Sequence, residues 1–164
     1  MVQDFFREDL SDFESYSAGK IDYNVRLNAN ESFNNLDFET RKEIGKAIEN
    51  SIYNRYPDPE SLEVCDLYAK YANVLSINVM AGNGSDECIQ IIAHTFLNAG
   101  DKVAMQSPDF SMYGLYTKVA GGIPIEFPLG AELELNVDGF ISMANSEKVK
   151  IVFLSNPNNP KIGR

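Results

Sequence analysis

The pattern of hydrophobic and polar positions predicts alternating helices and strands from about residue 37 onward. Hydrophobic residues at helical spacing predict helices over residues 38–52, over 60–73 and from Ser85 to just before Gly100. Short β-prone runs predict strands over residues 102–106, 123–127 and 150–155. Helices are expected from Pro108 to residue 121 and over 141–146. This alternation is typical of an α/β fold with a mostly parallel sheet and flanking helices.

The most informative stretch is Asn78–Phe96. A β-prone run (Ile77, Val79) leads into a turn of small residues, and Ser85 is expected to cap the helix that follows. The helix is expected to end before Gly100, and its buried face is predicted to contain Ile89, Ile92, Ala93, Phe96 and Leu97. A small-residue turn before a helix presents free backbone N–H groups to an anion such as a phosphate. The alternative is an ordinary strand–turn–helix unit that binds nothing.

Three turns follow predicted strands or β-prone runs and are expected at the carboxyl edge of the sheet, where such folds bind ligands. They are Gly82–Ser85, Ser107–Phe110 and Asn156–Pro160. The last leaves the apolar run Lys150–Ser155, which is expected to be a strand covered on both faces. Asparagine amides held there can donate to a ligand oxygen. Equally, Asn156–Pro160 can be a proline-rich turn held by its own asparagines.

The amino-terminal part of the chain is less regular. Asp37 is expected to cap the first long helix, whose inward face is predicted to contain Ile44, Ala47, Ile48 and Ile52. Two prolines, Pro57 and Pro59, then interrupt regular structure. We expect an amino-terminal arm with this first helix over residues 1–55 and a larger α/β domain over residues 56–164.

Composition narrows the class of protein. With 164 residues, 44% of them hydrophobic, the chain can bury a core. A net charge of −10 argues against nucleic acid and anionic membrane surfaces as partners. The sequence has no run long enough to span a membrane and no signal-peptide pattern, and Cys65 and Cys88 lack metal-type spacing. These features predict a cytoplasmic globular protein with two reduced thiols and no metal.

Several motifs then match a known family in order and spacing. They read LNANES, RYPDP, AGNGSDE, SPDFSMYG and NPNNP. Together they resemble the pyridoxal-phosphate aminotransferases of fold type I and, within that class, most resemble the histidinol-phosphate aminotransferases. The resemblance extends from about Tyr16 to Pro160. It implies transfer of an amino group between histidinol phosphate and 2-oxoglutarate in histidine biosynthesis, with pyridoxal 5'-phosphate as the cofactor.

The resemblance also implies roles for individual residues. The backbone N–H groups of Gly84, Ser85 and Asp86 would hold the cofactor phosphate, and Phe110 would stack on its pyridine ring. Asn159 would donate to the 3'-oxygen of the cofactor. Tyr56 would reach the phosphate of the neighbouring subunit's cofactor, which implies a homodimer. The residues expected to face the substrate are Tyr16 and Asn30. Without the resemblance, Phe110 and Tyr56 would be core aromatics and Tyr16 a surface anchor.

The chain departs from the family after Pro160, where Lys161 and three further residues replace the family's Thr-Gly. Members of the family are about twice as long. Their second half contains the lysine that forms the Schiff base, the aspartate that pairs with the pyridine nitrogen and an arginine for the substrate carboxylate. We therefore expect the amino-terminal half of an enzyme, inactive alone, as a truncated gene, a frameshift or an expression fragment would give. Lys161 cannot be assumed to replace the missing lysine.

Other interpretations stay open at this point. Within the class, a threonine-phosphate decarboxylase shares motifs of the YPDP and NPNNP type, and an aromatic aminotransferase is also possible. The LNANES stretch favours the histidinol-phosphate enzyme over the decarboxylase. Outside the class, Gly82 and Gly84 suggest a nucleotide-binding turn, although Glu87 stands where that motif needs its third glycine. A non-catalytic fragment is the remaining alternative.

Overall fold

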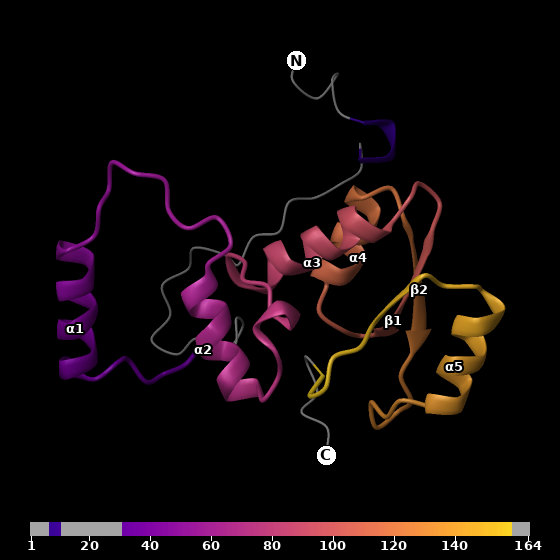
Figure 1. Ribbon diagram of the computed structural model, residues 1–164. Coiled ribbons are helices and arrows are strands. Elements are labelled where there is room, and N and C mark those ends of the chain that lie inside the picture. Colours follow the sequence, from indigo (N-terminus) through magenta and orange to yellow (C-terminus); the bar gives the residue numbers. More distant parts are fainter. Residues whose placement is uncertain (1–6, 11–30, 159–164) are drawn as a thin grey trace. The chain divides into compact units, whose positions relative to one another are not determined.

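The structure is a computed structural model that describes residues 7–10 and 31–158 (Figure 1). The chain forms two compact units, Met1–Pro59 and Glu60–Arg164. The domain assignment expected from the sequence, with an arm over residues 1–55 and a cofactor-binding domain over residues 56–164, stays a prediction. The sequence Val25–Leu27 also predicts a short strand, and it lies outside the described residues.

In the first unit, a 3-10 helix η2 (Glu8–Leu10) precedes the helix α1 (Phe38–Glu49). Asp37 caps α1 as predicted, because its carboxylate accepts the backbone N–H of Thr40 at 2.9 Å. The predicted inward face is wrong, since no residue of α1 is buried. Hydrophobic spacing defines an amphipathic face, but burial requires a packed partner for that face.

The second unit begins with α2 (Leu62–Ala72), which buries Cys65 and Ala69. A short 3-10 helix, η3 (Ser76–Asn78), replaces the strand expected around Ile77 and Val79. The backbone turns there because the N–H of Asn78 donates to Leu75 and that of Val79 to Ser76, each at 2.9 Å. The hydroxyl of Ser76 also donates to the carboxylate of Asp66 in α2. These local bonds prevail over β-propensity in a segment that has no partner strand among the described residues.

The next helix, α3, extends from Gly84 to Phe96, and its N-cap is Asn83 and not Ser85 as predicted. Its C-cap is Leu97, so the predicted cap at Gly100 is also wrong. Gly100 has a φ of +85° and donates its N–H to Gly121 at 2.9 Å, in a turn that leads to the sheet. On the predicted face, Ile89 and Ala93 are buried, whereas Phe96 is 58% exposed.

Three parallel strands form the sheet in the order β2-β1-β3. They are β1 (Lys102–Ser107), β2 (Ile123–Pro128) and β3 (Ile151–Phe153), and α4 (Met112–Val119) and α5 (Val137–Ser146) connect them. The α/β class predicted from the alternating pattern is therefore confirmed. The fourth helix begins at Met112, four residues after the expected start at Pro108, and the fifth begins before the expected Ile141.

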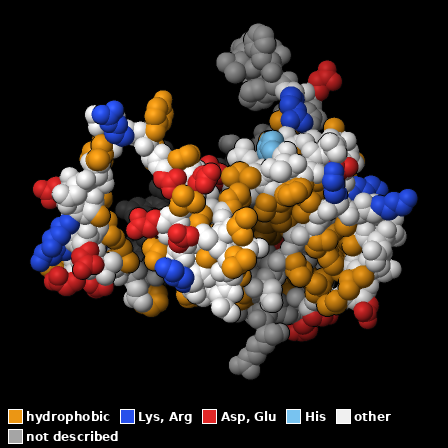
Figure 2. All heavy atoms as spheres, viewed as in Figure 1, with side chains coloured by type: hydrophobic (Ala, Val, Ile, Leu, Met, Phe, Trp, Pro, Cys, Tyr) orange, Lys and Arg blue, Asp and Glu red, His pale blue; other side chains and the backbone are white. Residues whose placement is uncertain are grey.

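The central strand β1 lies in the core, with residues 103–106 all buried. The core cluster joins it to α3, α4 and β3 and contains Ile89, Val103, Met105, Met112 and Phe153. The run around β3 is not covered on both faces as predicted, because Val152 is 47% and Leu154 54% exposed. Phe153 points into the core and its neighbours point away, so one face of this edge strand is covered. Figure 2 shows hydrophobic side chains open to solvent on the surface of the molecule.

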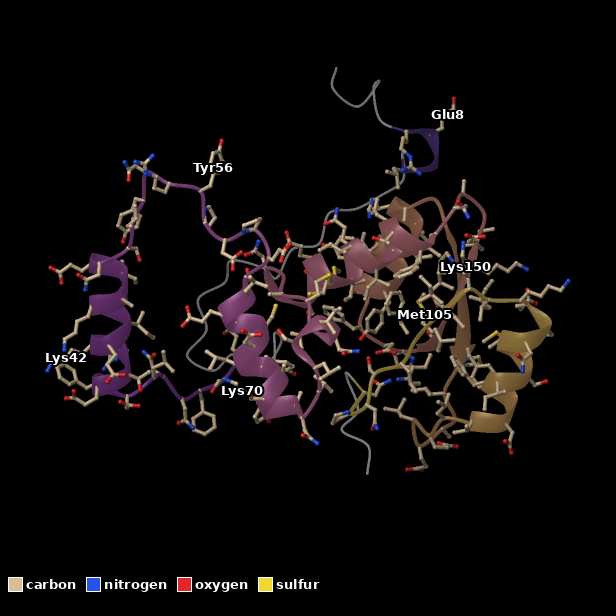
Figure 3. All side chains as sticks on the ribbon, in the orientation of Figure 1. Glu8, Lys42, Tyr56, Lys70, Met105 and Lys150 are labelled. Atoms are coloured by element: carbon tan, nitrogen blue, oxygen red, sulfur yellow. The ribbon has the colours of Figure 1, made fainter. Side chains whose placement is uncertain are left out.

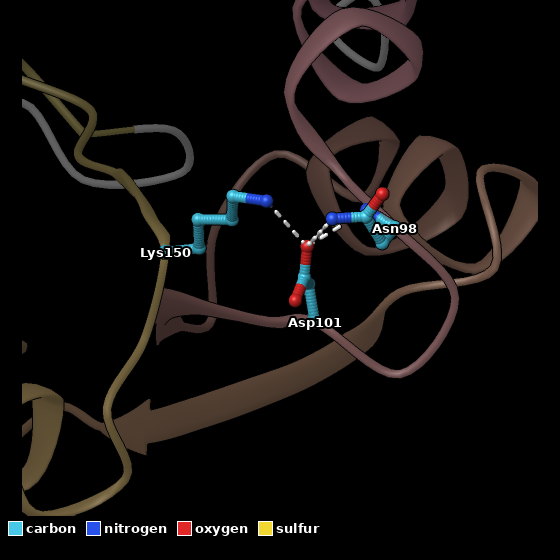
Figure 4. Close-up of polar contacts among 3 residues, drawn as sticks. All are labelled: Asn98, Asp101 and Lys150. Carbon is cyan, nitrogen blue, oxygen red and sulfur yellow. Dashed lines mark hydrogen bonds and ion pairs between the residues drawn. The ribbon is translucent and has the colours of Figure 1, made fainter.

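Ion pairs join the amino-terminal ends of β1 and β3. Lys150 Nζ lies 2.7 Å from Asp101 Oδ2, the oxygen that also accepts the backbone N–H of Asn98 at 2.7 Å (Figure 4). These bonds, that of Lys150 first, lower the pKa of Asp101 below its ordinary value of 3.8. Lys102 pairs with Glu147 at 2.6 Å. Both pairs link β1 with the chain around β3 and so help to set the register of the two strands.

Candidate functional site

The amino-terminus of α3 presents two backbone N–H groups that no hydrogen bond of the described residues uses. They belong to Ser85 and Asp86, in the first turn after the N-cap. Beside them, Gly84 has a φ of +79°, and a Cβ added there would meet no heavy atom within 4 Å. Unused donors next to open space are what an anion requires at a helix amino-terminus.

The turn before α3 is closely packed behind these donors. The N–H of Gly84, one of the three predicted donors, is already engaged with the carbonyl of Gly82 at 2.9 Å. Glu87 folds back so that its Oε2 accepts the N–H of Asn83 at 2.5 Å. A Cβ on Gly82 would lie 2.9 Å from Cys88 Sγ and 3.2 Å from Glu87 Oε2. Gly82 is therefore required by close packing and Gly84 by its left-handed backbone.

A second group of candidate residues lies at the same edge of the sheet. The helix α3 leads into β1 and α4 leaves it, so both helices have their amino-termini at the carboxyl end of β1, and they pack against each other (Figure 1). The loops that follow β1 and β3 also lie at this edge, because the strands are parallel. In parallel sheets this is the edge at which ligands bind.

A polar network joins the carboxyl ends of β1 and β3. Gln106, which is buried, donates its side-chain amide to the carbonyl of Ser155 at 3.1 Å. The hydroxyl of Ser155 donates to Asp109 Oδ1 at 2.6 Å, and the Tyr113 hydroxyl lies 3.2 Å from that of Ser155. Asn158 donates to the carbonyl of Pro108 at 3.4 Å. The network fixes the loop after β1 to the loop after β3.

Phe110 lies beside this network and packs against the core cluster. Its ring meets that of Tyr113 edge to face, with centroids 5.7 Å apart and planes at 86°. Tyr113 in turn stacks on Phe153 of β3, with centroids 4.7 Å apart and planes at 6°. Phe110 therefore borders the core at the edge of the sheet where ligands bind in such folds, and its stacking on a cofactor stays a prediction.

Of the other predicted site residues, the structure describes only Tyr56. Tyr56, in the loop after α1, is fully exposed and projects from its backbone (Figure 3). Tyr16, Asn30 and Asn159 lie outside the described residues, and so does Lys161. The stretch Ser107–Phe110 stands out in the sequence, but the role of the Asp109 carboxylate in the polar network was not predicted. The only signal was an acidic residue directly after a proline at a strand end.

Across residues 7–10 and 31–158, no helix is both long and apolar enough to cross a membrane. The same residues contain no group of three or more histidine, cysteine, aspartate or glutamate side chains arranged to hold a metal ion.

Comparison with known proteins gives close relatives. The histidinol-phosphate aminotransferase of Clostridium kluyveri is 45% identical over 160 residues, which are 98% of this chain and 46% of that protein. The histidinol-phosphate aminotransferase of Clostridium novyi is 42% identical over 163 residues, again 46% of its length. The chain thus spans about half the length of the curated relatives that it matches.

The structural comparison and the family comparison agree. The crystal structure of histidinol-phosphate aminotransferase from Sinorhizobium meliloti, in complex with pyridoxal-5'-phosphate, matches with a TM-score of 0.72 at 23% identity. The match covers 80% of this chain and 35% of that chain, and it establishes a shared fold. The family model for aminotransferase class I and II matches residues 24–161. The chain therefore belongs to the aminotransferase class I and II family.

Proposed function

We propose that this chain forms the cofactor-binding part of a pyridoxal-phosphate-dependent histidinol-phosphate aminotransferase. The observation that carries the proposal is the pair of unused N–H groups of Ser85 and Asp86 beside the open space at Gly84. That arrangement suits a phosphate, which both the cofactor and the amino donor contain. The names of the curated relatives give histidinol phosphate and amino transfer. In the proposed reaction the amino group of histidinol phosphate passes to 2-oxoglutarate, which yields imidazole-acetol phosphate and glutamate, as the family resemblance implies.

In this proposal each candidate site residue has a definite task. Ser85 and Asp86 donate their backbone N–H groups to the cofactor phosphate, and Gly84 leaves room for it. Phe110 stacks on the pyridine ring, and Asn159 donates to the 3'-oxygen. When bound, the cofactor supplies the electron sink that lets an amino group leave one carbon and join another. The chain's own residues bind the cofactor and hold its ring in one orientation.

The remaining assignments concern the substrate and a second subunit. Tyr16 and Asn30 face the substrate in this proposal, in which residues 1–55 form an arm and residues 56–164 form the cofactor-binding domain. The proposed assembly is a cytoplasmic homodimer in which Tyr56 reaches the cofactor phosphate of the partner subunit. Full exposure of the Tyr56 side chain leaves it available for such a contact.

The phosphate site can be tested by removing one donor. Proline is tolerated in the first turn of a helix and lacks an N–H, so Ser85→Pro removes the donor with little other change. Charge-assisted hydrogen bonds contribute ~1.5–3 kcal/mol each, so affinity for pyridoxal 5'-phosphate should fall roughly ten- to hundredfold. Ser85→Ala keeps the N–H and should bind nearly as the parent chain does. Equal binding by Ser85→Pro and the parent chain would contradict the proposed phosphate site.

The substrate can be tested with a chimera. Fusing this chain to the carboxyl-terminal part of the Clostridium kluyveri relative would supply the length that the chain does not span. The chimera should form glutamate from 2-oxoglutarate with histidinol phosphate in preference to phenylalanine or tyrosine. Preference for an aromatic amino acid, or decarboxylation of threonine phosphate, would refute the proposed substrate.

A further inference from the structure

The carboxylate of Asp109 holds the backbone of the proposed stacking residue. Asp109 Oδ1 accepts the N–H of Phe110 at 2.7 Å and the hydroxyl of Ser155 at 2.6 Å. Since Ser155 follows β3, these two bonds fix the start of the Phe110 loop to a second strand. A carboxylate that accepts two short bonds restrains a loop more than a neutral acceptor does.

The ring of Phe110 is restrained from the other side. Tyr113 contacts it edge to face and is itself stacked on Phe153 of β3. Because the Ser155 hydroxyl donates to Asp109, the Tyr113 hydroxyl at 3.2 Å must be the donor to Ser155. The polar contacts therefore form one chain from Tyr113 through Ser155 and Asp109 to the backbone of Phe110. The backbone of Phe110 is therefore linked to Ser155 after β3 by hydrogen bonds, and its ring is linked to Phe153 of β3 by aromatic contacts.

We propose that Asp109 is a positioning residue that sets the orientation of the Phe110 ring for stacking on the cofactor's pyridine ring. The inference rests on the proposed function and deepens it. Ring stacking depends on orientation, so a loop free to rotate would lose stacking and keep the phosphate contacts at α3. Asp109 should therefore affect binding of the whole cofactor and leave binding of inorganic phosphate unchanged.

The second oxygen of Asp109 indicates a conservative variant. Oδ2 is buried and has no hydrogen-bond partner among the described residues. Asp109→Asn can keep Oδ1 as the acceptor for Phe110 and Ser155, and its amide nitrogen replaces an oxygen that makes no bond. Asp109→Ala removes both bonds. Ser155→Ala removes only the bond between Asp109 and the chain after β3. It is the variant to measure if Asp109→Ala does not fold. Glu147→Gln, at the opposite edge of the sheet, is the matched control.

The test measures the 164-residue chain with two probes, pyridoxal 5'-phosphate and inorganic phosphate. Asp109→Ala should bind the cofactor about tenfold more weakly and bind inorganic phosphate within about twofold of the parent chain. The circular dichroism that the bound cofactor acquires from an oriented neighbouring ring should be lost. Asp109→Asn should restore most of both signals, Ser155→Ala should give intermediate values, and Glu147→Gln should match the parent chain.

A measurement without ligand keeps the two proposals separate. Amide hydrogen exchange at Phe110 should be faster in Asp109→Ala and near the parent rate in Asp109→Asn, because only the alanine lacks the acceptor. If the parent chain binds neither probe, the proposed function fails, and this exchange pattern then decides only whether Asp109 holds the backbone of Phe110. Unchanged exchange at Phe110, or equal weakening for both probes, would overturn the proposed positioning role.

Discussion

Substituting alanine for glycine is expected to have opposite effects on stability at two positions of the second unit. Gly84 has a φ of +79°, a conformation that residues with a Cβ rarely adopt. Its neighbourhood is open, so the cost of a methyl group there comes from the backbone and not from a clash. Gly114 lies inside α4 with ordinary helical geometry, and its added Cβ would make a normal contact of 3.7 Å with Met105 Sδ.

The magnitudes follow from these two environments. Left-handed geometry destabilises the folded state by about 1–2 kcal/mol for a residue with a Cβ. Alanine offsets ~0.4–1 kcal/mol of this, because it lowers the conformational entropy of the unfolded chain. Gly84→Ala should therefore destabilise the folded unit by about 1 kcal/mol. Gly114→Ala should stabilise it by about 0.5–1 kcal/mol, because alanine is the better helix former.

Urea unfolding followed by circular dichroism measures both effects. With a slope of about 1–3 kcal/mol per molar urea, the two midpoints should move in opposite directions by several tenths molar. The slope itself should not change. A Gly84→Ala midpoint equal to or above that of the parent chain would refute the reasoning. It would mean that the turn before α3 adopts another backbone conformation in solution.

Three further outcomes are expected. Because the pKa of Asp101 is lowered in the folded state, its carboxylate stabilises the fold above pH 3.8, and this stability is lost as the pH falls through the folded pKa. The loss of stability that Asp101→Asn causes in urea unfolding should therefore become smaller below pH 3.8. A loss that does not depend on pH contradicts this prediction. The 164-residue chain alone should form no glutamate from histidinol phosphate and 2-oxoglutarate, and cofactor-dependent turnover would show that it is sufficient. Val152 in the edge strand β3 and Leu154 directly after it are exposed, so sedimentation velocity at micromolar concentration should detect dimers or larger species, and a compact monomer would refute self-association.

The sequence by itself determined the succession of elements and the family. Hydrophobic spacing is a local property, and it predicted the helices α2 to α5 and the strands β1 to β3 to within about four residues, although it did not predict η3. The cap at Asp37 was also predictable, because it depends on a side chain three positions from its partner. The motifs that carry the family resemblance are local in the same sense. Each motif is a short run of consecutive residues, so it can be recognised without knowledge of the fold.

Only the tertiary structure decided which faces are covered and which polar groups meet. The apolar spacing of α1 and β3 could not reveal that Ile48 and Val152 are exposed, because burial depends on a partner elsewhere in the chain. Asp109 and Ser155 are 46 residues apart in the sequence, and the parallel pairing of β1 with β3 brings them together. Ser85 looked like a helix cap, but the N-cap is Asn83, two residues earlier, next to Gly82, against which Glu87 and Cys88 pack closely. Contacts between distant segments follow from chain topology, which residue spacing does not encode.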